Sequence, residues 1–347
     1  MKKINVLVTT VGGLTSPDIL NALKNTGYYD VTLFGTDAFK FAVGKEFVDY
    51  FEVLPSSGLN ELEFVHAIKE LVLTYKIDVI IPCGNEDNLV LAKYRGLIPC
   101  NIMVGEYKDL VVAYDKAEVY SELKSSMPQH APKHHVVRNY AGFLEAIKDL
   151  GYPNKRVVVK PRFGIGGRGV YILGGQFDFT KVFNSKPTNE YPLEFVDDIL
   201  KNKVEFDDLI VMECLSAPFY SAYSVCKNGK NIFTLSHVRE WGNASQTFRG
   251  SVCYDETIEM LASQVISKFN LSYTNNMELA VSDDGRIVLF DLNPRIGASS
   301  GIDRDIGFNF PLEAMKLTLG ENIESVDKNN FRESKVFVRY FQQIWPS

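Results

Sequence analysis

Residues 275–301 carry the side chains with the clearest chemical meaning. Asp284-Gly285 is a two-residue hairpin signal, and a type I′ turn there predicts Glu278 directly opposite Asp291. A four-residue loop would leave these acids diagonal on one face, whereas a three-residue loop would put them on opposite faces. Two facing carboxylates repel each other, so we expect a cation between them.

The same strand face supplies further groups for a metal-bound phosphate. Asn293 lies two residues beyond Asp291, and Arg295 joins them if the strand continues that far. Two carboxylates and an amide oxygen suit Mg²⁺ shared with substrate phosphates. Ala280 and Leu289 would form an apolar floor for a purine. A solvated edge hairpin is the alternative, but the opposite face is wholly apolar.

A glycine-rich loop precedes this hairpin by more than a hundred residues. Gly164, Gly166 and Gly169 have the spacing of a dinucleotide-binding fingerprint. A Rossmann loop must be followed by a helix and a Walker A loop by Lys and Ser or Thr, whereas here a β-branched and aromatic run follows. The remaining interpretations are a hairpin over phosphates, aided by Lys160 and Arg168, or a flexible hairpin tip.

The predicted elements around these motifs follow two different patterns of secondary structure along the chain. In the first part, apolar strands alternate with amphipathic helices, which predicts a parallel α/β sheet up to about residue 112. We expect strands at 4–10, 31–37 and 77–84, and helices at 16–27 and 59–76. Residues 84–87 are either a contact loop at the carboxyl edge of this sheet or first-turn helix acids.

From about residue 113 the chain has an α+β pattern with strands in antiparallel-looking pairs. The expected pairs are 156–161 with 169–173, 209–215 with 220–236, and 276–281 with 286–292.

Composition excludes several classes of protein. The chain has 347 residues, 46% of them apolar, and a net charge of -6 without a basic stripe, which argues against nucleic-acid binding. No signal peptide or membrane-spanning run is expected, so we predict a cytoplasmic protein. The five cysteines are widely spaced, which disfavours a zinc site or a disulfide framework.

From about residue 4 to residue 320, the chain resembles the ATP-grasp superfamily, and within it the large subunit of carbamoyl phosphate synthase and its stand-alone relatives. The strongest part is "FDLNPRIGASSGIDRDIGFNFP", residues 290–311. The resemblance implies a parallel-sheet pre-ATP-grasp domain (1–112), an ATP-grasp small lobe with a glycine-rich lid (113–209) and a large antiparallel-sheet lobe with the metal site (210–347).

The resemblance also implies roles for individual residues. The phosphate-binding residues would be two lysines and the lid: Lys116, Lys160, Gly164, Gly166, Gly167, Arg168 and Gly169. The hinge that meets the adenine through its backbone would be Met212, Glu213, Cys214 and Leu215, and the magnesium ligands would be Glu278, Asp291 and Asn293.

Three arginines are implied near the reacting groups. Arg295 matches the arginine that faces the acyl phosphate and the second substrate, and Lys160 would share in neutralising charge there. Arg239 and Arg249 lie where relatives place substrate-facing basic residues, with a surface arginine as the alternative. His237 is expected as a strand residue with a local hydrogen bond rather than as a catalytic base.

One departure from the family pattern concerns the ribose. Many members follow the hinge with a Gly-x-Glu whose carboxylate holds the ribose, whereas this chain reads "SAPFYSAYSV". Tyr220 or Ser221 would substitute only weakly.

The implied activity is an ATP- and Mg²⁺-dependent ligase, with Mn²⁺ as another usable ion. It would activate a small carboxylate as an acyl phosphate for attack by an amine or similar nucleophile. The alternatives are a carbamoyl phosphate synthase-like kinase acting on bicarbonate or carbamate, and a non-catalytic nucleotide-binding regulatory module. The expected partners are small molecules and a second copy of the chain in a homodimer, with no nucleic acid and no membrane.

Overall fold

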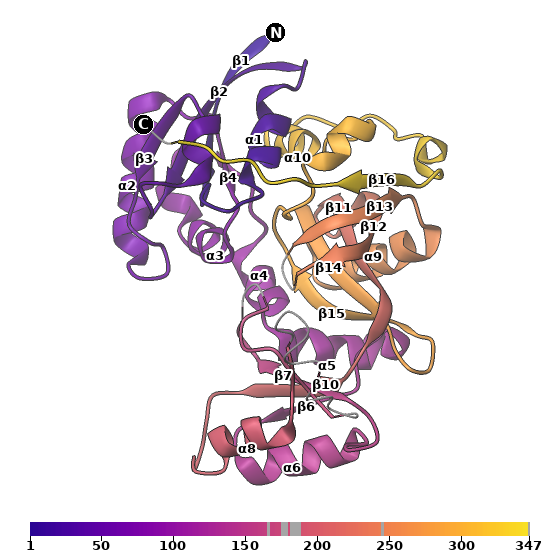
Figure 1. Cartoon of the computed structure of the whole chain (residues 1–347). Helices are drawn as coiled ribbons and strands as arrows, with labels where there is room; N and C mark the ends of the chain where they lie inside the picture. Colours follow the sequence, from indigo (N-terminus) through magenta and orange to yellow (C-terminus); the bar gives the residue numbers. More distant parts are fainter. Residues whose placement is uncertain (165–166, 175–179, 181–188, 244–245, 346–347) are drawn as a thin grey trace.

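The computed structural model of the chain describes residues 1–164, 167–174, 180, 189–243 and 246–345 (Figure 1). Its described strands form three sheets that follow one another along the chain. The first is parallel and the last antiparallel, which confirms the predicted combination of α/β and α+β parts.

The first sheet has the strand order β3-β2-β1-β4-β5. Its strands are β1 (Lys2–Thr9), β2 (Tyr29–Asp37), β3 (Tyr50–Val53), β4 (Val79–Pro82) and β5 (Asn101–Ile102). The helices between and after them are α1 (Ser16–Lys24), η1 (Val43–Phe47), α2 (Glu61–Tyr75), α3 (Asn85–Lys93), η2 (Arg95–Leu97) and α4 (Tyr107–Tyr114). Because all pairings are parallel, the carboxyl ends of the strands share one edge, and α3 begins there.

The second sheet has the order β6-β10-β7-β8-β9. It consists of β6 (His134–Val137), β7 (Val157–Pro161), β8 (Tyr171–Leu173), β9 (Glu190–Tyr191) and β10 (Leu209–Glu213), with helices α5 (Lys116–Ser126), η3 (Pro128–His130), α6 (Tyr140–Asp149) and α8 (Leu193–Leu200) in the same stretch of chain. Strands β7 and β8 pair antiparallel on either side of the glycine-rich loop, as predicted.

The pairing expected for residues 209–215 is wrong. Strand β10 hydrogen-bonds with β6 and β7, so the second sheet extends to Glu213. Strand β11 (Ser216–Lys227) instead forms a hairpin with β12 (Lys230–Gly242) through the turn at Asn228-Gly229. The short turn favours pairing of β11 with β12 because the two strands are adjacent in the sequence.

The third sheet has the order β15-β14-β11-β12-β13-β16. Its remaining strands are β13 (Thr247–Cys253), β14 (Tyr273–Val281), β15 (Ile287–Asn293) and β16 (Lys335–Val338), and its helices are α9 (Glu256–Lys268), η4 (Ile302–Ile306), α10 (Phe310–Thr318) and η5 (Lys328–Phe331).

Two apolar layers cover the faces of this third sheet. One layer holds Met277 and Leu279 of β14 together with residues of α5 and α9. The other joins Tyr223 of β11 with Val6 of β1 and Phe310 of α10 in one continuous core. The N-terminal sheet therefore lies beside the third sheet, with the small lobe beyond both (Figure 1).

Candidate functional site

The two predicted carboxylates face each other across β14 and β15. Glu278 lies directly opposite Asp291, as predicted, but the loop between the strands differs from the prediction. Ser282 and Arg286 close a three-residue loop in which Gly285 has a φ of +81°, a value that favours glycine.

A three-residue loop alone would place the acids on opposite faces. A β-bulge after Leu289 shifts the register between Leu279 and Glu278, so Phe290 is the extra residue on β15. This one-residue insertion compensates for the shorter loop and returns Asp291 to the face of Glu278.

Both carboxylates are surrounded by donors. Arg239 Nη1 lies 3.1 Å from Glu278 Oε2, which also accepts a 2.8 Å hydrogen bond from Ser221 Oγ. Lys116 Nζ lies 3.2 Å from Asp291 Oδ1, and the side-chain amide of Asn293 donates to Asp291 Oδ2 at 2.9 Å. The expected positive charge beside the acids is thus supplied here by Arg239 and Lys116.

Lys160 is buried beneath the same hairpin, with 7% of its surface exposed. Its Nζ donates to Tyr120 Oη at 2.7 Å and to the carbonyl oxygen of Phe290 at 3.0 Å. The Tyr120 hydroxyl in turn donates to the Phe290 carbonyl. Burial lowers the pKa of Lys160 to about 8, Asp291 opposes this effect, and Lys116 adds to it.

The glycine-rich loop is tied to the carboxylates through Lys116. Lys116 Nζ donates to the carbonyl oxygen of Gly164 at 3.0 Å while it pairs with Asp291. Arg162, at the start of this loop, forms two hydrogen bonds with Asp115, which caps α5 immediately before Lys116. Gly167, Arg168 and Gly169 lie in the turn before β8, whereas Gly166 lies outside the described residues.

The predicted hinge, residues 212–215, comprises the end of β10 and the two residues before β11. Met212 and Leu215 are buried, and burial raises the pKa of the Cys214 thiol. The Glu213 carboxylate accepts hydrogen bonds from Arg286 at 2.9 and 3.2 Å. Ser221, suggested as a weak substitute for the ribose acid, is bound to Glu278 instead.

The arginines expected near the reaction have different positions. Arg239 contacts Glu278, whereas Arg249 forms an ion pair with Glu240 and is more than half exposed. Arg295 extends to the N-terminal sheet, where its Nε donates to the side chain of Asn85. The structure therefore brings Arg239 to the carboxylates, places Arg295 against the first residue of α3, and leaves Arg249 on the surface.

Within the 84–87 loop, the acids belong to the first turn of α3. Asp87 is buried and accepts hydrogen bonds from the hydroxyls of Thr9, Thr10 and Ser57. This carboxylate stabilises the edge of the sheet. The contact with Arg295 comes from Asn85 instead.

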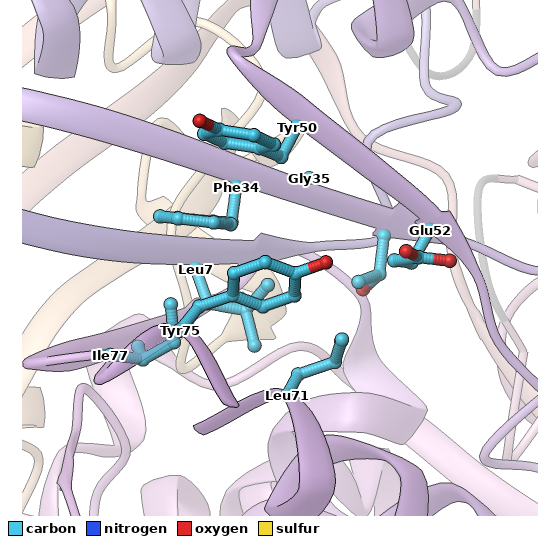
Figure 2. Close-up of a pocket in the computed structure, with 9 residues that line it drawn as sticks. Leu7, Phe34, Gly35, Tyr50, Glu52, Leu71, Tyr75 and Ile77 are labelled. Atoms are coloured by element: carbon cyan, nitrogen blue, oxygen red, sulfur yellow. The ribbon is translucent and has the colours of Figure 1, made fainter. Parts of the chain in front are cut away.

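Two small pockets lie in the N-terminal sheet. Figure 2 shows a pocket of about 10 Å³ beside the stacked rings of Phe34 and Tyr50, with Tyr75 close by. A second pocket of about 130 Å³ is lined by Thr10, Asp37 and other residues at the carboxyl ends of β1 and β2. None of the predicted catalytic, nucleotide-binding or metal-ligating residues lines either pocket.

Residues 205–344 match the family described as "ATP-grasp in the biosynthetic pathway with Ter operon". Over these residues the chain is similar to ATP-grasp proteins. The carbamoyl phosphate synthase large chain of Methanobrevibacter smithii is 21% identical to this chain over 279 residues, which are 77% of this chain and 25% of the relative. The chain thus spans about a quarter of the length of that relative.

Solved ATP-grasp structures share the fold. The L-amino acid ligase of Bacillus licheniformis superimposes with a TM-score of 0.63 at 14% identity, covering 95% of this chain and 76% of the ligase. The biotin carboxylase domain dimer of the Hydrogenobacter thermophilus 2-oxoglutarate carboxylase, solved with MgADP and bicarbonate, gives 0.63 at 13% identity, with coverages of 96% and 73%. At these identities the comparison establishes the fold alone.

Two residues of the candidate site were not identified from the sequence. Tyr120 holds Lys160, and Asn276 donates to Glu278 Oε1 at 2.8 Å. Tyr120 carries a signal in hindsight, because it lies four residues after Lys116 in α5 and so shares its helix face. Asn85 lies within the predicted contact loop 84–87, but its partner Arg295 is distant in sequence and was not predicted.

The donor set of the carboxylate hairpin fits a hard divalent cation. Glu278, Asp291 and Asn293 offer only oxygen ligands, and the buried Asn276 Oδ1 beside them has no hydrogen-bond partner. No cluster of three His, Cys, Asp or Glu residues suited to a metal occurs among the described residues. A cation here would therefore depend on amide and phosphate oxygens besides the two acids, and Lys116 and Arg239 would have to yield their positions.

Proposed function

We propose that this chain is an ATP- and Mg²⁺-dependent ligase that activates a carboxylate as an acyl phosphate for attack by an amine or similar nucleophile. The observation that carries the proposal is the meeting of Lys116 with Asp291 beneath the glycine-rich loop, beside the buried Lys160. Transfer of a phosphoryl group requires bound phosphates and neutralised charge. Two lysines, a glycine-rich loop and a carboxylate pair in one place can provide both.

In this proposal each group has a defined task. Lys116, Lys160 and the backbone of the loop with Gly164, Gly166, Gly167, Arg168 and Gly169 bind the phosphates, while the backbone of residues 212–215 contacts the adenine. Glu278, Asp291 and Asn293 hold the magnesium, which neutralises phosphate charge when bound. Arg295 and Arg239 face the acyl phosphate. The surface position of Arg249 gives it no task in this scheme.

The chemistry proceeds in two steps. A carboxylate oxygen attacks the γ-phosphorus, the bond to the β,γ-bridging oxygen breaks, and ADP leaves. The amine then attacks the acyl carbon, inorganic phosphate leaves, and the amine gives up a proton. The chain supplies alignment and positive charge for both steps rather than a covalent nucleophile.

The test is incubation with ATP, Mg²⁺ and libraries of carboxylates and amines, with ADP release and product mass as readouts. Hydroxylamine, added without an amine substrate, traps an acyl phosphate as a hydroxamate. ADP and hydroxamate that both require a particular carboxylate would support the ligase. Thermal stabilisation by nucleotide without ADP in any mixture would contradict it and favour a nucleotide-binding module.

A kinase acting on bicarbonate or carbamate is the second proposal, because the curated relative is a carbamoyl phosphate synthase large chain. ADP release that depends on bicarbonate and not on any organic carboxylate would favour it. Replacing Mg²⁺ by Mn²⁺ in the same assay tests whether the site accepts either ion.

The setting of this activity is also a proposal. Among the described residues, no helix is both long enough and apolar enough to span a membrane, and we propose a cytoplasmic location. One solved relative is described as a dimer, which supports a homodimer testable by light scattering.

We propose three domains at 1–112, 113–213 and 214–347, with the second boundary moved from residue 209 to the end of β10.

A further inference from the structure

His237 of β12 and Asp303 of η4 form a hydrogen-bonded pair in the interior. The two residues are 1% and 0% exposed, and His237 Nε2 lies 2.9 and 3.0 Å from the two carboxylate oxygens. The partner lies 66 residues away, so the hydrogen bond is not the local one expected for His237. Apolar residues of similar volume often stabilise a fold as well as a buried ion pair does, so stability alone does not explain this pair.

Asp303 fixes the far end of the segment that begins at Arg295. Near the middle of this segment, Gly297 lies against the ring of Tyr223, where a Cβ added to the glycine would approach Cε1 to 2.1 Å. Arg339 donates to the carbonyl oxygen of Ala298 at 3.1 Å. The segment between Arg295 and Asp303 is therefore held at several points against the third sheet.

His237 fixes the strand that carries Arg239. The two residues are two positions apart in β12, so their side chains leave the same face of the sheet. Along the sheet, His237 lies opposite Ser221, and Ser221 lies opposite Glu278. The ring of His237 also packs 4.6 Å from that of Tyr223, the ring that Gly297 contacts.

We propose that His237 and Asp303 are positioning residues that set the placement of Arg295 relative to Arg239 across the reaction site. The pair links β12, which carries Arg239, to the segment that begins at Arg295. It does not contact Lys116 or Lys160. The inference rests on the proposed function, because that function assigns the arginines to the acyl phosphate. Loss of the pair slows turnover and leaves nucleotide binding intact.

The decisive variant replaces both residues by apolar ones, His237→Phe with Asp303→Leu. We expect a melting temperature close to that of the wild type and an unchanged thermal shift by MgADP. We expect kcat to fall more than about tenfold while KM for ATP changes less than about twofold, since small misplacements of reacting groups are costly. Wild-type kcat in this stable variant would overturn the proposal, because a purely structural pair is replaceable.

A second measurement does not depend on turnover. Hydrogen exchange of the amides in residues 295–303 should rise in the double variant, while β7 and β10 keep wild-type rates. Unchanged exchange in that segment overturns the inference even if no substrate is found, and a wild type that turns over no carboxylate overturns only the proposed function. If the double variant does not fold, Asp303→Asn, which keeps the size of the side chain, takes its place under the same criteria.

The matched control is Glu313→Gln, which removes the largely buried Glu313–Lys316 ion pair on α10. This variant loses an ion pair of similar length that lies on another element. We expect wild-type kcat and wild-type exchange in residues 295–303. A fall in kcat as large as that of the double variant would show that any lost ion pair has this effect and would overturn the specific assignment.

Discussion

Glu278 and Asp291 face each other because Phe290 bulges out of the ladder between β14 and β15. The bulge also has a second consequence, since the Phe290 carbonyl accepts hydrogen bonds from Lys160 and Tyr120. One inserted residue thus places the carboxylate pair on one face and holds the buried lysine beneath it.

Deletion of Phe290 should keep the two carboxylates on one face but remove the carbonyl that binds Lys160. The pairs on both sides of the bulge would then form a regular ladder, so Glu278 and Asp291 stay opposite each other while Lys160 loses its carbonyl partner. We expect a folded protein with about tenfold weaker MgADP binding, measured by calorimetry, for a loss of about 1.4 kcal/mol. Phe290→Ala keeps the backbone and should bind MgADP more tightly than the deletion; equal affinities would contradict this role of the carbonyl.

Asp291→Ala should abolish Mg²⁺-dependent ADP release and leave the fold intact. The carboxylate is partly exposed and contributes to no core, but it is the residue on which Lys116 and Asn293 converge. We expect at least a hundredfold loss of rate, in line with removal of a group that organises transition-state charge. Circular dichroism checks the fold, and undiminished turnover would rule out the metal assignment.

Lys160→Met should change how stability depends on pH. The folded-state pKa of about 8 lies below the ordinary 10.5, so the unfolded chain binds more protons between these values and wild-type stability rises with pH. For this residue the rise from pH 7 to pH 9.5 is about 2 kcal/mol. Urea denaturation at both pH values should show no such increase in the free energy of unfolding of the methionine variant. An identical pH slope in both proteins would contradict the burial of the Lys160 charge.

Gly297→Ala should destabilise the fold through a clash with Tyr223. A Cβ at this position lies 2.1 Å from Tyr223 Cε1, inside a core where the ring has no room to move. Overpacking of this kind costs about 1–3 kcal/mol, which thermal unfolding will detect. Gly13→Ala is the control, because nothing lies within 4 Å of its Cβ position, and equal losses in the two variants would exclude the clash as the cause.

Local patterns in the sequence determined the elements and the chemistry of the hairpin. Continuous apolar runs predicted the buried parallel strands, and the strand after Gly169 excluded a dinucleotide loop. The period of two in β14 and β15 placed Glu278 opposite Asp291, although the predicted turn was wrong. This prediction succeeded because the bulge compensated for the three-residue loop, and no residue type marked Phe290 as the insertion.

Only the tertiary structure decided which distant residues meet at the site. Arg295 binds Asn85 at the start of α3, Tyr120 and the Phe290 carbonyl hold Lys160, and His237 pairs with Asp303. Periodicity and turn residues report on neighbours along the chain, whereas these contacts depend on how three sheets pack. The sequence by itself therefore determined the kinds of groups available, and packing determined which of them lie within hydrogen-bonding distance.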